Sequence, residues 1–320
     1  MDSSIGLIDV HHHAIPELYL AALAERGVRA PVQGASFPAW DPEASLAVMD
    51  EAGIATAILS ISSPGLADAA GEDACRLARR VNEHLAGVVH EHPTRFGAFA
   101  LIPVHEMSSA LGEVAYALDQ LGLDGVGVYT STWGRYLGDS QFEPLLATLA
   151  DRQVPVFVHP VLPPQPGPLF GAPGSVAEFP IETTRAVMSL LFSGTLDRHP
   201  GLKLILSHAG GTVPFLAPRI AHAATIDPDL RGKPPADLLG SLRRLYYDVA
   251  MSATPTQLAC LGDLVDPSHI LFGSDFPFMP AHHALDNAAG LRRYPGLSAL
   301  QLERVGRGNA LDLFPRVRPA

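Results

Sequence analysis

The sequence has few cysteines and no long apolar run, and both absences restrict what the protein can be. Its 320 residues include only two cysteines, Cys75 and Cys260. Two are too few for a disulfide framework and suit a reducing compartment. No apolar stretch reaches the roughly 18 residues needed to span a bilayer, and no basic segment followed by an apolar run opens the chain. We therefore expect a cytoplasmic protein that has no membrane partner.

Positive charge is also scarce. The chain has 22 Lys and Arg residues against 33 Asp and Glu residues, which gives a formal net charge of −11. A phosphate backbone requires clustered Lys and Arg side chains, so we do not expect nucleic acid as a partner. A small anionic substrate is still compatible with this charge, because one arginine or one metal cation reverses the local field.

Short apolar runs alternate with amphipathic stretches along the whole chain. Eight runs rich in β-branched residues predict strands over residues 6–10, 55–61, 97–102, 125–129, 154–158, 203–207, 245–249 and 270–273. Helices are predicted between most of them, over residues 73–90, 108–121, 142–152, 183–198 and 255–265. Such alternation predicts an α/β fold, a (β/α)₈ TIM-like barrel.

The length, with 47% hydrophobic residues and no linker, charge block or repeat, favours a single domain over residues 1–320. Residues 17–46 and the Pro/Gly-rich residues 162–178 are predicted to be loop insertions over the C-terminal face of the barrel. A doubly wound sheet is the alternative. It is disfavoured because the Gly-rich phosphate loop expected after its first strand is missing here.

The first predicted strand ends in three consecutive histidines. Residues i and i+2 of a strand share a face, with Cα atoms about 6.6 Å apart. His11 and His13 can therefore close on one metal ion while His12 points away. A tag remnant is disfavoured, because the triplet follows an apolar strand and does not stand at the terminus. The run predicts part of a metal site.

Three more polar residues follow predicted strands: His159 the fifth, His208 the sixth and Asp275 the eighth. The C-terminal ends of barrel strands meet at one mouth, so these side chains should converge with His11 and His13. Three imidazoles and a carboxylate suit Zn²⁺, with Mn²⁺, Fe²⁺ or Co²⁺ as alternatives. We expect His11, His13, His159 and Asp275 as ligands and His208 as an unligated acid or base. Spacing alone leaves His208 open as a ligand.

With these motifs the chain resembles the amidohydrolase superfamily, in the branch typified by aminocarboxymuconate semialdehyde decarboxylase. The matching stretches are residues 9–13, 158–160, 207–211, 273–277 and 308–310. They occur in the family's order and cover nearly the whole chain. The resemblance implies a divalent metal, usually zinc, on the four expected ligands, and a catalytic role for His208. Members of this branch are commonly dimers, so a homodimer is expected.

The chain is also similar to 6-methylsalicylate decarboxylases, through residues 38–41, 57–65 and 179–186. Residues 34–39 lack an arginine that the aminocarboxymuconate enzymes place ahead of their Trp-Asp-Pro stretch, which favours a small aromatic acid with a single carboxylate. Arg219 matches a substrate-carboxylate arginine that reaches the neighbouring subunit's site in this family. The alternative is that Arg219 is a helix residue that forms an ordinary salt bridge on the surface. Trp40 and Phe278 are candidate walls for the aromatic ring.

Two enzyme functions fit these residues. In the first, a salicylate-type acid loses CO₂ without oxidation: the metal binds its carboxylate and phenolate, and Asp275 or His208 protonates the ring carbon. In the second, an activated water hydrolyses a lactone, ester or amide, and Asp275 takes the water's proton. Spacing does not separate the two, and only the stretches shared with the decarboxylases favour the first. A non-catalytic metal-binding barrel would require an incomplete set of residues, and none is missing.

Overall fold

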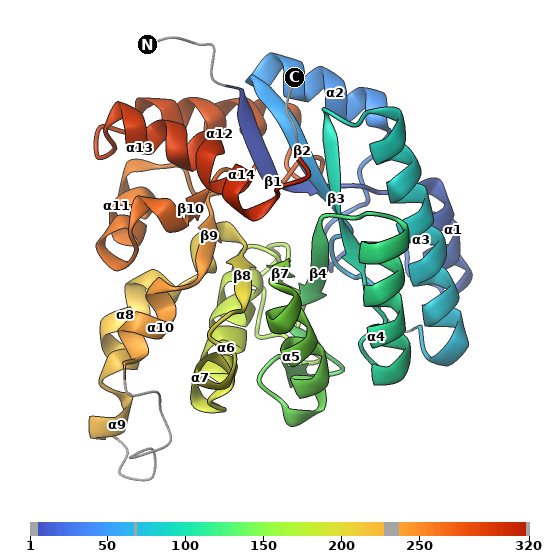
Figure 1. Ribbon diagram of the computed structural model, residues 1–320, viewed down its shortest axis with the longest axis horizontal. Helices are drawn as coiled ribbons and strands as arrows, with labels where there is room; N and C mark the ends of the chain where they lie inside the picture. Colours follow the sequence, from blue (N-terminus) through green and yellow to red (C-terminus); the bar gives the residue numbers. More distant parts are fainter. Residues whose placement is uncertain (1–5, 67–68, 227–236, 318–320) are drawn as a thin grey trace.

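Eight parallel strands form the centre of the computed structural model, which describes residues 6–66, 69–226 and 237–317 (Figure 1). The strands are β1 (Leu7–His13), β2 (Ile54–Ser60), β3 (Phe96–Leu101), β4 (Gly125–Tyr129), β7 (Pro155–His159), β8 (Lys203–Leu206), β9 (Tyr246–Asp248) and β10 (Ile270–Leu271). They pair in chain order. The amide of Val10 donates to the carbonyl of Phe272 at 3.0 Å, which joins the first strand to the last. The predicted (β/α)₈ barrel is confirmed.

Helices surround the barrel (Figure 1). They are α1 (Glu17–Glu25), α2 (Pro42–Ala52), α3 (Gly71–Glu91), α4 (Met107–Ala115), α5 (Glu143–Arg152), α6 (Glu178–Phe192), α7 (Thr195–Arg198), α8 (Val213–Ala221), α9 (Ala223–Ile226), α10 (Leu238–Arg243), α11 (Pro255–Leu264), α12 (Ala281–Arg293), α13 (Ala299–Glu303) and α14 (Asn309–Leu313). All five predicted helices are present. The stretch 183–198 is two helices, because Gly194 takes a left-handed φ of 76° between α6 and α7.

Apolar side chains fill the barrel interior below the metal-ligand candidates. Six strands contribute, through Ile8 and Val10 (β1), Ile58 (β2), Phe99 (β3), Phe157 (β7), Ile205 (β8) and Leu271 (β10). Phe314, which follows α14, packs on this cluster, and its ring centroid lies 5.6 Å from that of Phe99. Only the C-terminal end of the barrel is therefore left for a polar site.

The two predicted insertions lie at that end, since residues of both line the cavity described below. The first is not all loop: residues 17–46 contain α1 and the beginning of α2. Helix α2 begins where the side chain of Asp41 accepts a hydrogen bond from the amide of Ala44 at 2.7 Å. A short hairpin, β5 (Ser131–Thr132) with β6 (Arg135–Tyr136), was not predicted. Among the described residues, none of the helices is long and apolar enough to cross a membrane.

Candidate metal centre

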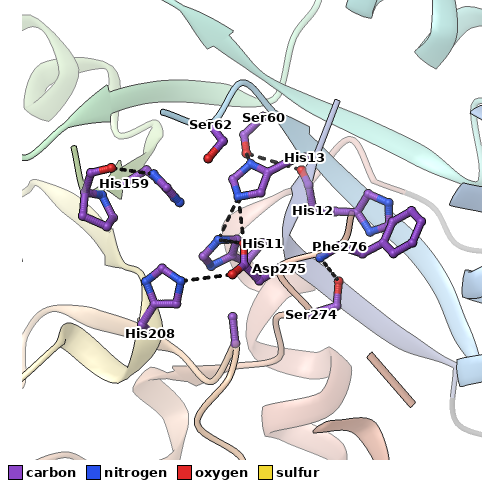
Figure 2. A network of polar contacts seen from close by, with 12 residues as sticks. His11, His12, His13, Ser60, Ser62, His159, His208, Ser274, Asp275 and Phe276 are labelled. Carbon is purple, nitrogen blue, oxygen red and sulfur yellow. Dashed lines mark hydrogen bonds and ion pairs between the residues drawn. The ribbon is translucent and has the colours of Figure 1, made fainter. Parts of the chain in front are cut away.

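A β-bulge in β1 sets the direction of its histidines. The pairing of β1 with β2 shifts register between Asp9 and His12. His11 lies within the shift and His13 just after it; both face the barrel mouth and are fully buried. His12 points the other way (Figure 2) and bonds to Asp9 Oδ2 and Ser45 Oγ, each at 3.0 Å. His12 therefore holds β1 against α2 and leaves its two neighbours for the site.

The loop after β8 carries His208 in a strained conformation. His208, Ala209, Gly210 and Gly211 all have positive φ, between 54° and 73°. Two glycines are required by close contacts: a Cβ at Gly210 would lie 2.6 Å from Tyr247, and a Cβ at Gly211 would lie 2.2 Å from the carbonyl oxygen of Pro180. This loop turns the imidazole of His208 into the mouth.

Replacing Gly211 by alanine should lower the free energy of unfolding by roughly 2 kcal/mol and reduce activity, because φ 63° and ψ −119° are closed to a residue with a Cβ. Denaturant unfolding and a turnover assay measure both effects. Gly112→Ala is the matched control. It lies in α4, where the added Cβ meets no atom within 4 Å, and should lose nothing. Equal unfolding curves for wild type and Gly211→Ala would contradict the assigned role of the loop.

Asp275 brings the histidines together (Figure 2). Its Oδ1 lies 3.3 Å from His11 Nε2 and 3.2 Å from His13 Nε2, and its Oδ2 lies 3.4 Å from His208 Nε2. The Nε2 atoms of His11 and His13 are 3.0 Å apart. Ligand atoms of His11, His159, His208 and Asp275 all lie within 4.8 Å of one another. The five residues predicted from the sequence thus form one cluster.

The far nitrogens of three imidazoles are held by hydrogen bonds. Nδ1 of His159 lies 2.9 Å from the carbonyl oxygen of Pro160, which can only accept, so this nitrogen carries the proton. Nδ1 of His11 likewise donates to the carboxylate of Asp248 at 2.9 Å. Ser60 Oγ donates to the carbonyl of His12 and therefore accepts from Nδ1 of His13 at 2.9 Å. All three Nε2 lone pairs are left for the centre of the cluster.

His208 differs from these three. Its Nδ1 is buried and has no hydrogen-bond partner in the part of the chain that the structure describes. Its one side-chain contact runs from Nε2 to Asp275 Oδ2 at 3.4 Å, and a carboxylate oxygen only accepts, so the proton lies on Nε2. A metal ligand would have to offer a lone pair at this nitrogen, whereas a proton held beside a carboxylate suits a group that gives and takes a proton.

The two carboxylates in the cluster require a positive charge close to them. Asp248 is fully buried and Asp275 nearly so, and buried carboxylates require a positive partner. Burial alone lowers the pKa of His11, but Asp248 and Asp275 outweigh it and raise that pKa from 6.5 to about 10. Burial lowers the pKa of His13 to about 4 and holds the pKa of His159 well below its usual value. The neutral imidazoles of His13 and His159 fit a divalent metal ion, and the two carboxylates that hold a second proton on His11 would favour the ion in place of that proton.

Asp248 belongs to the site, although the sequence around it does not indicate a direct role. Besides His11 Nδ1, it accepts hydrogen bonds from the amides of His208 at 3.1 Å and Ala250 at 2.9 Å. Asp248 is not among the site residues expected from the sequence. Its position at the carboxyl end of the seventh barrel strand, β9, was the available signal. One side chain therefore orients both a candidate ligand and the loop that carries His208.

Changing Asp248 to asparagine should weaken metal binding by roughly 10- to 100-fold, because an amide nitrogen would then face the Nδ1 proton of His11. Competition with a chromogenic chelator measures the affinity. Asp119→Asn, which removes an exposed carboxylate paired with Arg152, is the control and should bind metal normally. An unchanged affinity in Asp248→Asn would show that the contact does not support ligation.

A cavity of about 600 Å³ opens above the cluster. His159, His208 and Asp275 line one end of it. Phe278 also lines it, with its ring centroid 5.3 Å from that of His13 and an interplanar angle of 77°. The structure therefore brings Phe278 to the position expected for the wall of a ring-binding site.

Two predicted substrate residues lie away from this cavity. Trp40 is half-buried behind His12, packs against Val48 and Phe276, and donates from Nε1 to Ser45 Oγ at 2.9 Å. Arg219 is exposed on α8 and does not line the cavity of a single chain. Their roles at the substrate stay predictions.

The family model for amidohydrolases matches residues 8–316. The chain belongs to the amidohydrolase family. It is 36% identical over 323 residues to a 6-methylsalicylic acid decarboxylase of Penicillium expansum, covering 97% of both chains. It is also 36% identical to a decarboxylase, macB, of Penicillium terrestre, covering 97% of this chain and 95% of that protein.

Among solved structures, a dihydroxybenzoic acid decarboxylase from Polaromonas sp. JS666 superposes with a TM-score of 0.81 at 27% identity, covering 98% of each chain. That structure contains manganese and the inhibitor 2-nitroresorcinol. Of the two enzyme functions open from the sequence, these relatives favour the decarboxylase over the hydrolase.

Proposed function

We propose that this protein is a metal-dependent decarboxylase that removes CO₂ from a salicylate-type aromatic acid. The observation that carries the proposal is the cluster at the barrel mouth. Three imidazoles with fixed Nδ1 protons face a buried carboxylate and a fourth imidazole that contacts this carboxylate through Nε2, below a cavity with aromatic walls. Relatives across the full length of the chain carry the same activity in their names.

We assign His11, His13, His159 and Asp275 as metal ligands. The anchored Nδ1 atoms support this set, because each Nε2 then offers a lone pair toward the centre. When bound, the metal supplies Lewis acidity, which steadies negative charge on the carboxylate and phenol oxygens of the substrate. Zn²⁺ suits the donor set, and the manganese in the Polaromonas structure makes Mn²⁺ the direct competitor.

The chain's own contribution is to place the ring and to move a proton. Phe278 and Phe179 give a flat ring apolar walls beside His13 and His159. His208 Nε2 and Asp275 Oδ2 are 3.4 Å apart, so one proton can pass between them and on to the ring carbon that bears the carboxylate. As that carbon gains the proton, its bond to the carboxylate breaks, the bonding pair restores the aromatic ring, and CO₂ leaves.

The test is an assay for CO₂ and phenol on metal-free protein reloaded with Zn²⁺ or Mn²⁺. With 6-methylsalicylate, metal-dependent formation of 3-methylphenol is expected, and the faster metal identifies the working ion. Turnover of an aryl ester or lactone, without product from any hydroxybenzoate, would overturn the proposal in favour of hydrolysis. We also place the enzyme in the cytoplasm, since its two cysteines are both free.

We further propose a homodimer in which Arg219 of each protomer serves the substrate carboxylate in the partner's cavity. Its exposed position on α8, outside its own cavity, supports this arrangement. A guanidinium suits a planar carboxylate.

Co-expression of Arg219→Ala with Asp275→Asn tests the exchange between protomers, with sedimentation giving the oligomeric state. Each variant alone should be nearly inactive. Random pairing should restore about a quarter of the wild-type activity, because half of the dimers are mixed and each holds one intact site. No recovery in mixed dimers would place Arg219 in its own protomer's site or outside catalysis.

A further inference from the structure

The cavity is much larger than the acid named for the similar decarboxylases. Its volume of about 600 Å³ lies in the middle of the range for sites that enclose drug-sized ligands. A methylsalicylate has only eleven non-hydrogen atoms and would occupy the end next to His159, His208 and Asp275. The cavity continues from there to α11, where Thr256, Gln257 and Cys260 line its far wall.

The walls between these two ends are mostly apolar. Val32, Phe179, Phe215, Met251 and Met279 line them beside a few serine and threonine side chains, and no Lys or Arg side chain of the described residues of the same chain does. A ligand group in this part of the cavity would gain from burial of apolar surface, and a second charged group would find no counter-ion.

Gln257 in the far wall already has hydrogen-bond partners outside that wall. Gln257 accepts a hydrogen bond from Thr254 Oγ1 at 2.7 Å and lies 3.5 Å from Ser252 Oγ through its amide nitrogen. Burial raises the pKa of the Cys260 thiol, with Asp263 adding to the effect, so this side chain stays neutral. Apart from the exposed Thr256, the far wall therefore favours an apolar group on the ligand.

Resting on the proposed function, we infer that the preferred substrate is a hydroxybenzoic acid that carries an extended apolar substituent, longer than a methyl group, which fills the cavity from the metal centre toward α11. The exposed apolar side chains at the mouth, Phe215 at 79% and Met251 at 50%, extend the same apolar surface outward.

A series of 2-hydroxy-6-alkylbenzoates with methyl, propyl, pentyl and heptyl chains tests this inference. Each buried methylene should raise kcat/KM by about three- to fourfold until the chain reaches the far wall. A steady fall in kcat/KM from methyl to heptyl would overturn it and would indicate that a second copy of the chain closes the cavity. Absence of turnover for the entire series would instead count against the proposed function.

A binding measurement distinguishes failure of this inference from failure of the proposed function, because it needs no turnover. In a Cys75→Ala background, Cys260 is the one thiol left in the chain, and its alkylation by N-ethylmaleimide reports on the far wall. The heptyl acid should slow labelling at concentrations at which the methyl acid does not. If both acids are present at concentrations that saturate binding at the metal centre, equal labelling rates would show that the heptyl chain does not reach the far wall.

Shortening the cavity gives an independent check. Cys260→Trp should lower the ratio of kcat/KM for the heptyl acid over the methyl acid by at least tenfold. Thr256→Phe, one turn earlier on α11 at an exposed position, serves if the first variant does not fold. Cys75→Trp places the same bulk on α3, outside the cavity, and should leave the ratio unchanged. An unchanged ratio in both α11 variants would overturn the inference.

Discussion

Asp275→Asn should lower turnover by on the order of 10³-fold or more while the barrel stays folded. The carboxylate lies within 3.4 Å of three imidazole nitrogens, on His11, His13 and His208. An amide of the same shape carries no negative charge and no transferable proton. It would therefore weaken the metal site and interrupt the proton path together. The backbone tolerates the exchange, because asparagine readily adopts the positive φ of 62° found at this position.

Initial rates of CO₂ release, together with circular dichroism and bound-metal content, measure this effect. Asp263→Asn, an exposed carboxylate on α11, is the control and should match wild type in all three. A folded, metal-loaded Asp275→Asn variant that turns over within tenfold of wild type would remove Asp275 from both assigned roles.

The barrel could be predicted because the order of the apolar runs along the sequence is also the order in which the strands pair. Each strand is a short apolar run, and strands that pair in chain order need no distant partner to be located. The convergence of His11, His159 and Asp275 followed from the same geometry, since polar residues after barrel strands share one mouth. The sequence therefore predicted which side chains meet.

The contacts behind those side chains could not be predicted. The partner of His11 Nδ1 is Asp248, 237 residues away, and the partner of His13 Nδ1 is Ser60. Such pairs depend on rotamers and on the register shift in β1, which no periodicity encodes. For the same reason the sequence left open whether His208 binds the metal.

Residues 179–186 have a structural part in the site that their resemblance alone does not reveal. Their likeness to 6-methylsalicylate decarboxylases favours a substrate class. In the structure, Thr184 Oγ1 lies 2.7 Å from Thr212 Oγ1 and accepts from the amide of Thr212, and the carbonyl of Pro180 packs against Gly211. Pro180 and Thr184 thus support the loop that carries His208, while Phe179 lines the cavity and contacts the ring of His159.

Metal content should distinguish the two ligand sets that the sequence left open. We expect His13→Ala to lose nearly all of its bound metal, because the substitution deletes an Nε2 that lies 3.0 Å from that of His11 and 3.2 Å from Asp275. We expect His208→Asn to keep its metal and to lose turnover by about 10²-fold or more, as for a missing acid or base. Asparagine is chosen because position 208 has a φ of 54°.

Elemental analysis after gel filtration gives the metal content of each variant, with His283→Ala on the exposed face of α12 as the control. The opposite outcome, full metal in His13→Ala and none in His208→Asn, would assign the metal to the group of His11, His159, His208 and Asp275, whose ligand atoms also lie within 4.8 Å of one another. His208 could not then deliver the proton while bound to the ion through the same nitrogen. Asp275 would be left as the acid, and the unpartnered Nδ1 of His208 would need another explanation.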